Sequence, residues 1–87
     1  MRHYKITAKG KVQGVGFRNF TKVYADSKGY TGSVQNLANG NVEIFVTLDD
    51  LGEFLAALQQ GNGRMQAKTF EVEHLEVLQF SSFEVLP

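Results

Sequence analysis

The chain opens with alternating hydrophobic and polar side chains. Over residues 3–9, Tyr4, Ile6 and Ala8 point to one side of an extended chain, and the residues between them are polar. A period of two is typical of a strand with one buried face. We therefore predict a half-buried strand over residues 3–9.

A helical period replaces the alternation from residue 17 to residue 28. The positions that recur at helical spacing are Phe17, Phe20, Val23, Tyr24 and Ser27. Gly29 follows at the place where a helix often ends in a left-handed glycine. This pattern predicts a first helix whose inner face carries those residues.

Two strand-like runs follow, over residues 32–37 and 41–47. Between them lies Ala38-Asn39-Gly40, and Asn-Gly is a strong signal for a hairpin turn. Three alternate hydrophobic residues mark the inner face of the second run: Val42, Ile44 and Val46. These runs predict a β-hairpin.

A second helix is predicted after Asp49-Asp50, which suit a helix N-terminus as capping acids. Its hydrophobic positions follow i, i+3, i+4 and i+7: Leu51, Phe54, Leu55 and Leu58. Residues 61–63 end it.

Residues 69–77 predict a further strand with a bulge or bend near His74, and residues 82–86 predict a short last strand.

The order strand, helix, strand, strand, helix, strand fits one antiparallel sheet with both helices on one face. The predicted fold is a ferredoxin-like α+β sandwich with a short extra C-terminal strand. A chain of 87 residues suits a single domain, which we expect to span residues 1–87.

Composition narrows the classes of function. Nine basic residues balance nine acidic ones, which argues against binding nucleic acid mainly through its phosphates. Any anion site must therefore be local. The chain has no cysteine, which excludes a disulfide framework, a thiolate nucleophile and a Cys-type zinc site. The segment near Met1 lacks an apolar signal core, so we expect a cytoplasmic protein. We also expect a monomer that does not bind membranes.

A glycine-rich segment between the first strand and the first helix is the strongest candidate site. Gly14 and Gly16 let backbone N–H groups converge on an anion. The helix N-terminus adds unpaired N–H donors and a positive dipole. Arg18 adds a permanent charge with a planar fork suited to phosphate. We therefore predict an anion site here.

Topology adds Asn36. It lies at the end of the second strand, which must meet the same sheet edge as the glycine-rich segment. Its parity matches Val34, which places it on the helix-covered side, where a polar group needs a partner. One strand should separate the first and second strands, leaving a gap of about 10 Å for a phosphate and a water.

Two segments carry a resemblance to a known family. Gly10-Lys11-Val12-Gln13-Gly14-Val15-Gly16-Phe17-Arg18 is similar to the first acylphosphatase signature, Gly-x-Val-Gln-Gly-Val-x-Phe-Arg. Gly32-Ser33-Val34-Gln35-Asn36 resembles the second, Gly-x-Val-x-Asn. The resemblance covers essentially the whole chain in length and element order.

The resemblance implies hydrolysis of acyl phosphates to carboxylate and phosphate, without metal or cofactor. It implies that Arg18 binds the phosphate and that Asn36 orients the attacking water. It also implies a phosphate-binding segment with these residues: Gln13, Gly14, Val15, Gly16, Phe17 and Arg18. Inorganic phosphate or a similar anion is the expected product and inhibitor.

Some positions depart from the family pattern. Many members carry Gly-Pro where this chain has Gly61-Asn62-Gly63-Arg64, and the chain ends in Leu86-Pro87. The loop before the last strand is also short, with Leu78-Gln79-Phe80. We expect none of these positions to touch the two signature segments.

Other interpretations stay open on the residues alone. The same fold could serve as a non-catalytic anion-binding module, including a stand-alone copy of the acylphosphatase-like domain of carbamoyl-transfer maturation proteins. A small RNA-binding domain is a third class, which the zero net charge disfavours. His3 and His74 are interpreted as strand-surface residues rather than catalysts or ligands.

Overall fold

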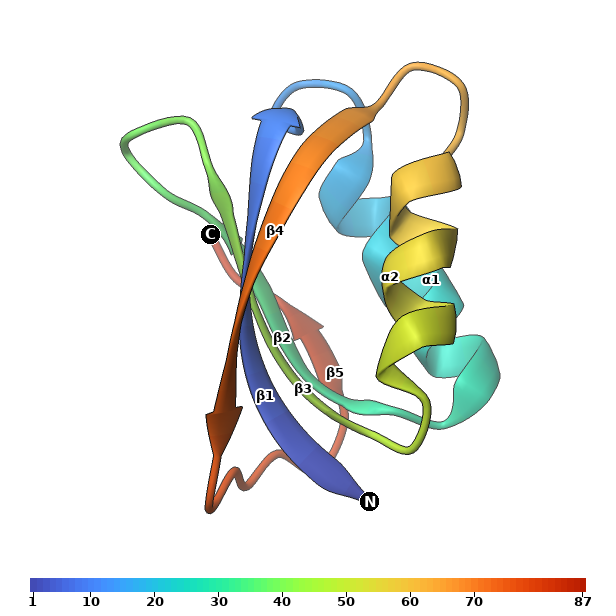
Figure 1. Ribbon diagram of the computed structural model, residues 1–87, viewed down its shortest axis with the longest axis vertical. Helices are drawn as coiled ribbons and strands as arrows, with labels where there is room; N and C mark the ends of the chain where they lie inside the picture. The colour runs from blue at the N-terminus through green and yellow to red at the C-terminus, as the bar shows by residue number, and fades with distance from the viewer.

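The computed structural model describes residues 1–87 as one five-stranded sheet covered by two helices. The elements in chain order are β1 (Arg2–Lys11), α1 (Phe17–Lys28), β2 (Thr31–Asn36), β3 (Val42–Leu48), α2 (Leu51–Gln60), β4 (Gln66–Leu75) and β5 (Phe83–Val85). The strand order is β4-β1-β3-β2-β5. Both helices lie on the same face of the sheet (Figure 1), so the predicted α+β sandwich is confirmed.

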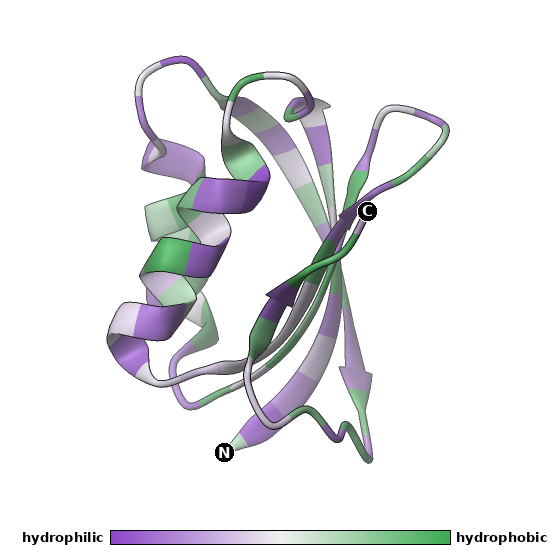
Figure 2. Cartoon of the chain, turned by 180° about the vertical axis from the view of Figure 1, so that it is seen from behind, coloured by the Kyte–Doolittle hydropathy of each residue, from purple (hydrophilic) through white to green (hydrophobic).

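The predicted alternation sets the register of the sheet. β1 and β3 pair antiparallel with Ile6 opposite Ile44 and Ala8 opposite Val42. All four side chains are buried between sheet and helices. The alternating bands along the strands in Figure 2 reflect this two-residue period. The core therefore sits between the helix layer and the inner face of the sheet.

Helix α1 has the predicted bounds but a narrower inner face. Phe17, Thr21 and Ala25 are its buried residues, spaced four apart along one stripe. Val23 is 60% exposed and Ser27 is also exposed, so the prediction that they belong to the inner face is wrong. Helical spacing alone did not separate the centre of the stripe from its margins.

The irregularity in β4 also lies elsewhere than predicted. Lys9 of β1 faces Thr69, whereas the next residue, Gly10, faces Ala67, so Lys68 is the extra residue. No shift occurs at His74, which faces Tyr4 in regular register. The two rings meet edge to face, with centroids 5.6 Å apart. His74 thus stays on the helix side, at the exposed margin of an edge strand.

The last strand makes the sheet mixed. The four longer strands are antiparallel, whereas β5 pairs parallel with β2, with Gly32 opposite Phe83 and Val34 opposite Val85. Phe83 is almost fully buried. Because β5 lies beside β2, it brings the end of the chain next to the second signature segment.

Three connections gather at one end of the molecule. The β1–α1 loop, the β2–β3 hairpin and the α2–β4 loop all lie at the top of Figure 1. β3 lies between β1 and β2, as the predicted gap requires. No helix is long and apolar enough to cross a membrane.

Candidate active site

The start of α1 is built with its N–H groups unpaired. Its N-cap is Gly16, in a left-handed conformation with φ 84°, and no side chain caps the helix. No acid lies in the first turn. No protein acceptor takes a hydrogen bond from the backbone N–H groups of residues 13–19. These donors and the positive end of the helix dipole are thus available to an anion.

Helix α2 shows that this arrangement is not general in the molecule. Its N-cap Asp50 accepts a hydrogen bond from the Glu53 N–H at 3.0 Å, and Glu53 adds a negative charge to the first turn. A capped and acidic N-terminus satisfies its own donors and repels anions. Only α1 is left open, and it follows the glycine-rich loop.

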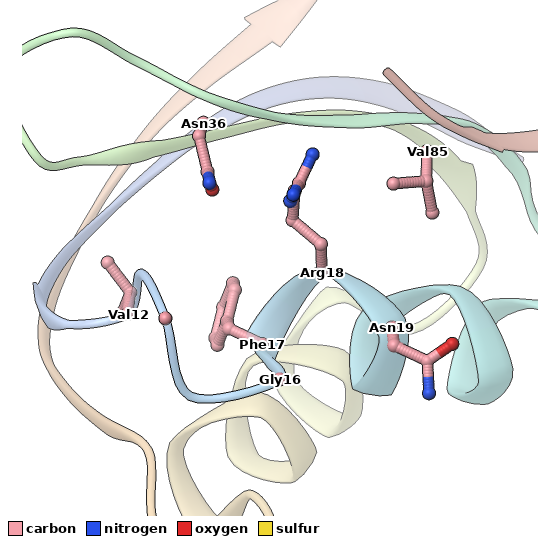
Figure 3. Close-up of a pocket in the computed structure, with 8 residues that line it drawn as sticks. Val12, Gly16, Phe17, Arg18, Asn19, Asn36 and Val85 are labelled. Carbon is pink, nitrogen blue, oxygen red and sulfur yellow. The ribbon is translucent and has the colours of Figure 1, made fainter. Parts of the chain in front are cut away.

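Arg18 points from the first turn of α1 across to the sheet. Its Nη1 donates to the Leu86 carbonyl at 2.9 Å, and Figure 3 shows the side chain directed between Asn36 and Val85. One N–H group of the guanidinium is held by the C-terminal segment. The remaining N–H groups of the fork stay available to a ligand.

Asn36 faces Arg18 from the end of β2. It pairs with Val42 in the same register that places Val34 opposite Ile44, so the predicted helix-side orientation is confirmed. Its Oδ1 is buried and has no hydrogen-bond partner in the protein. A buried unpaired acceptor is costly, by about 1–3 kcal/mol, and such groups are usually satisfied by a ligand or water.

Arg18 and Asn36 line one cavity of about 410 Å³. Its other lining residues are Val12, Gly14, Gly16, Phe17, Asn19 and Val85, and Figure 3 shows seven of the eight labelled around one opening. Val12, Asn19 and Val85 were not among the predicted binding residues, although Val12 belongs to the first signature segment. Val85 enters only because β5 pairs with β2, which no local pattern specifies.

The predicted binding residues do not all face this cavity. Gly14, Gly16, Phe17 and Arg18 line it, whereas Gln13 and Val15 do not. The Gln13 side chain donates to the carbonyls of Leu37 and Asn41, each at 2.8 Å. It therefore ties the loop to the β2–β3 hairpin, and only its backbone N–H remains for an anion.

Three residues at the positions that depart from the family pattern, Asn62, Leu86 and Pro87, touch the signature segments, so the expectation that they do not is wrong. Asn62 Nδ2 donates to the Val15 carbonyl at 3.1 Å. Leu86 accepts from Arg18, and the Pro87 carbonyl accepts from Gln35 at 3.1 Å. All three contacts join segments far apart in the chain, so no local sequence pattern indicates them.

The cavity contains one ionisable side chain, Arg18. The side chains with a shifted pKa lie elsewhere, where α1 and α2 meet. There, burial and a hydrogen bond to Asp49 raise the pKa of Tyr30 to about 12. The Lys28 ammonium and the Tyr24 hydroxyl hydrogen-bond Glu53 and hold the pKa of its carboxyl below its usual value. Within the cavity lining, the charge of Arg18 is therefore opposed by no acidic side chain.

This geometry can hold a small dianion and place a water beside it. Amides, the helix dipole and a guanidinium supply the positive potential. The Asn36 side-chain amide across the cavity carries a donor and an acceptor that can fix a water's orientation. Neither group is a strong base, so the arrangement favours reactions that need positioning and charge stabilisation.

Comparison with known proteins connects this geometry to an activity. The family model described as acylphosphatase matches residues 4–85. An acylphosphatase from Archaeoglobus fulgidus is 39% identical over 83 residues, which cover 93% of each chain. The structure of the acylphosphatase from Bacillus subtilis has a TM-score of 0.92 and 31% identity, and covers 100% of both chains. HypF from T. kodakarensis has a TM-score of 0.80 and 28% identity over 98% of this chain, but only 12% of HypF is covered.

Proposed function

This chain belongs to the acylphosphatase family and is a hydrolase of that type, and we propose that its Arg18 and Asn36 carry the reaction. The substrate is an acyl phosphate, and the products are a carboxylate and inorganic phosphate. The observation that supports these roles most directly is the shared cavity, which Arg18 and Asn36 both line beside backbone N–H groups that have no acceptor in the protein.

The phosphoryl group is bound at the start of α1. Backbone N–H groups of the β1–α1 loop and the first helical turn bind its oxygens, and Arg18 neutralises part of their charge. Phosphoryl transfer runs through a loose transition state with charge spread over those oxygens. Preorganised donors stabilise that charge without reorganising during the reaction. The Leu86 carbonyl keeps the guanidinium in place.

The water is held by Asn36. Its side-chain amide hydrogen-bonds to the water and directs a lone pair of the water oxygen at phosphorus, opposite the leaving group. The water oxygen forms a new bond to phosphorus as the bond from phosphorus to the acyl oxygen breaks. The bonding electrons leave with the carboxylate. The water's proton passes to a phosphate oxygen, so both hydrogens end on the phosphate product.

No side-chain base is needed in this scheme. A carboxylate is a good leaving group, and the cavity is lined by no Asp, Glu or His. We therefore expect no enzyme base with a pKa near neutrality in the pH–rate profile. We also expect full activity after treatment with a chelator. Loss of activity in the chelator would contradict the scheme.

Substitution of the two residues tests these roles with benzoyl phosphate as substrate. Arg18→Ala should lower kcat/KM by about 10²–10³-fold, because it removes the charge that stabilises the transition state. Asn36→Ala should lower kcat by a similar factor while the inhibition constant of phosphate changes only about twofold. Each variant should keep the native circular dichroism spectrum.

Arg2→Ala is the matched control for the loss of a guanidinium, because Arg2 is exposed at the start of β1. It should retain wild-type turnover. Near-wild-type turnover by a folded Arg18→Ala or Asn36→Ala variant would refute the assigned roles.

A further inference from the structure

A side chain of the α2–β4 loop, Asn62, hydrogen-bonds to the β1–α1 loop. Asn62 Nδ2 donates to the Val15 carbonyl at 3.1 Å. The Oδ1 of the same side chain accepts from the backbone N–H groups of Arg64 at 3.0 Å and Met65 at 3.2 Å. Met65 is buried in the core. Asn62 is therefore fixed by its own turn while it holds the neighbouring loop.

The peptide that Asn62 holds is one that forms the site. Gly16 lines the cavity with Arg18 and Asn36, whereas Asn62 does not line it. In a planar trans peptide the C=O and N–H groups point in opposite directions, and the chain has no cis peptide bond. With the Val15 carbonyl held toward Asn62, the Gly16 N–H points away from Asn62. That N–H has no acceptor in the protein.

The loop needs such a constraint because its backbone is permissive. Gly14 and Gly16 both have positive φ, 73° and 84°, and glycine moves between such conformations with little steric cost. The contact is also close. A Cβ on Gly16 would lie 3.3 Å from Asn62 Nδ2 and 3.6 Å from the Arg64 guanidinium. The two loops are thus packed together at the peptide in question.

We propose that Asn62 is a positioning residue for catalysis: through the Val15 carbonyl it orients the Gly16 N–H into the cavity, toward a phosphate oxygen. The proposal rests on the function proposed above and extends it to a residue outside both signature segments. Without the Asn62 donor, the Val15–Gly16 peptide can rotate, and the site loses one of its aligned N–H donors while its charge from Arg18 is kept.

Two substitutions distinguish the hydrogen bond from Asn62 to Val15 from the hydrogen bonds that Asn62 accepts within its own turn. Asn62→Asp keeps the oxygen that accepts from Arg64 and Met65 but removes the Nδ2 donor. Asn62→Ala removes both the Nδ2 donor and the Oδ1 acceptor without adding charge. Asn39→Asp is the matched control, because Asn39 Oδ1 accepts from the Asn41 N–H in the same kind of turn, and the side chain has no hydrogen bond to the β1–α1 loop.

The readouts are the inhibition constant of inorganic phosphate, kcat/KM for benzoyl phosphate, and the amide NMR shift of Gly16 during a phosphate titration. Both Asn62 variants should bind phosphate about tenfold or more weakly, as loss of one hydrogen bond to a charged group predicts. They should lower kcat/KM by at least as much and shrink the Gly16 shift. The Asn62→Asp defect should persist in 0.5 M salt, where a charge effect would be screened.

The proposal is overturned if the Gly16 amide of the wild type does not respond to phosphate, a result that needs no variant. It is also overturned if the folded Asn62 variants match Asn39→Asp in phosphate affinity and turnover. Either result leaves the roles of Arg18 and Asn36 intact, because those are judged by their own variants. Wild-type activity of Arg18→Ala would instead refute the proposed function.

Discussion

At the scale of single residues, Gln13 shows how a signature side chain serves the site without facing it. Its amide donates to two carbonyls that follow Asn36 in the chain, those of Leu37 and Asn41. The first signature segment is thereby tied to the hairpin that carries the second. A ligand held between Arg18 and Asn36 depends on that separation staying fixed.

Substitutions of Gln13 should therefore act through stability. Gln13→Ala should lower the free energy of unfolding by about 1–3 kcal/mol, because two part-buried hydrogen bonds are lost, although each carbonyl keeps one backbone donor. Gln13→Glu should cost more at pH 7, since an ionised carboxylate only accepts hydrogen bonds and would face two carbonyl oxygens. Denaturant unfolding at pH 7 measures both. Equal stability of the wild type and the Glu variant would show that these hydrogen bonds contribute nothing.

Residues differ in how far the sequence alone could place them. Arg18 and Asn36 were predictable because helix position and strand parity follow from local periods of 3.6 and two residues. Asn62 was not, because its partner Val15 lies 47 positions away in the chain. The contact depends on how two loops meet, which no local pattern encodes.

At the scale of elements, the two helices differ at their N-termini, and the difference follows from a few residues. Gly16 leaves α1 uncapped, whereas Asp50 caps α2. Both features could be predicted from the residue types. The bulge at Lys68 could not, because the close approach of Gly10 to the β4 backbone appears only when the strands pair.

A tyrosine at the contact between α1 and α2 loses its proton only at high pH. Tyr30, just after α1, donates to Asp49 Oδ1 at 3.0 Å and is 5% exposed. Burial first, and then the hydrogen bond to Asp49, raise its pKa from 10.0 to about 12. The folded state thus favours the neutral phenol. This stabilisation is complete below pH 10 and is lost as the pH rises from 10 toward 12.

Tyr30→Phe should therefore weaken the alkaline loss of stability. Between pH 10 and 12 the wild type should lose up to about 1.4 kcal/mol per pH unit more than the variant. At pH 8 the variant should be less stable by about 1 kcal/mol, because the hydrogen bond is gone. Urea unfolding across this range checks both. Parallel curves for the two proteins would mean that Tyr30 does not carry the alkaline transition.

At the scale of the whole molecule, the sheet order creates the site. Because β3 lies between β1 and β2, the end of β2 faces the start of α1 across a gap that neither segment could form alone. β5 closes one side by adding Val85 and the Leu86 carbonyl. The chain carries no net charge, so the affinity of this end for an anion depends on the local donors and on Arg18.

The most direct test of this account is a phosphate titration of the isotopically labelled wild-type protein, followed by the NMR shifts of its backbone and side-chain amides. The account predicts saturable shifts that are largest at the backbone amides of Gly14, Gly16 and Arg18 and at the Asn36 side-chain amide, with little change on the open face of the sheet. Shifts centred on another surface, or none at saturating phosphate, would contradict it.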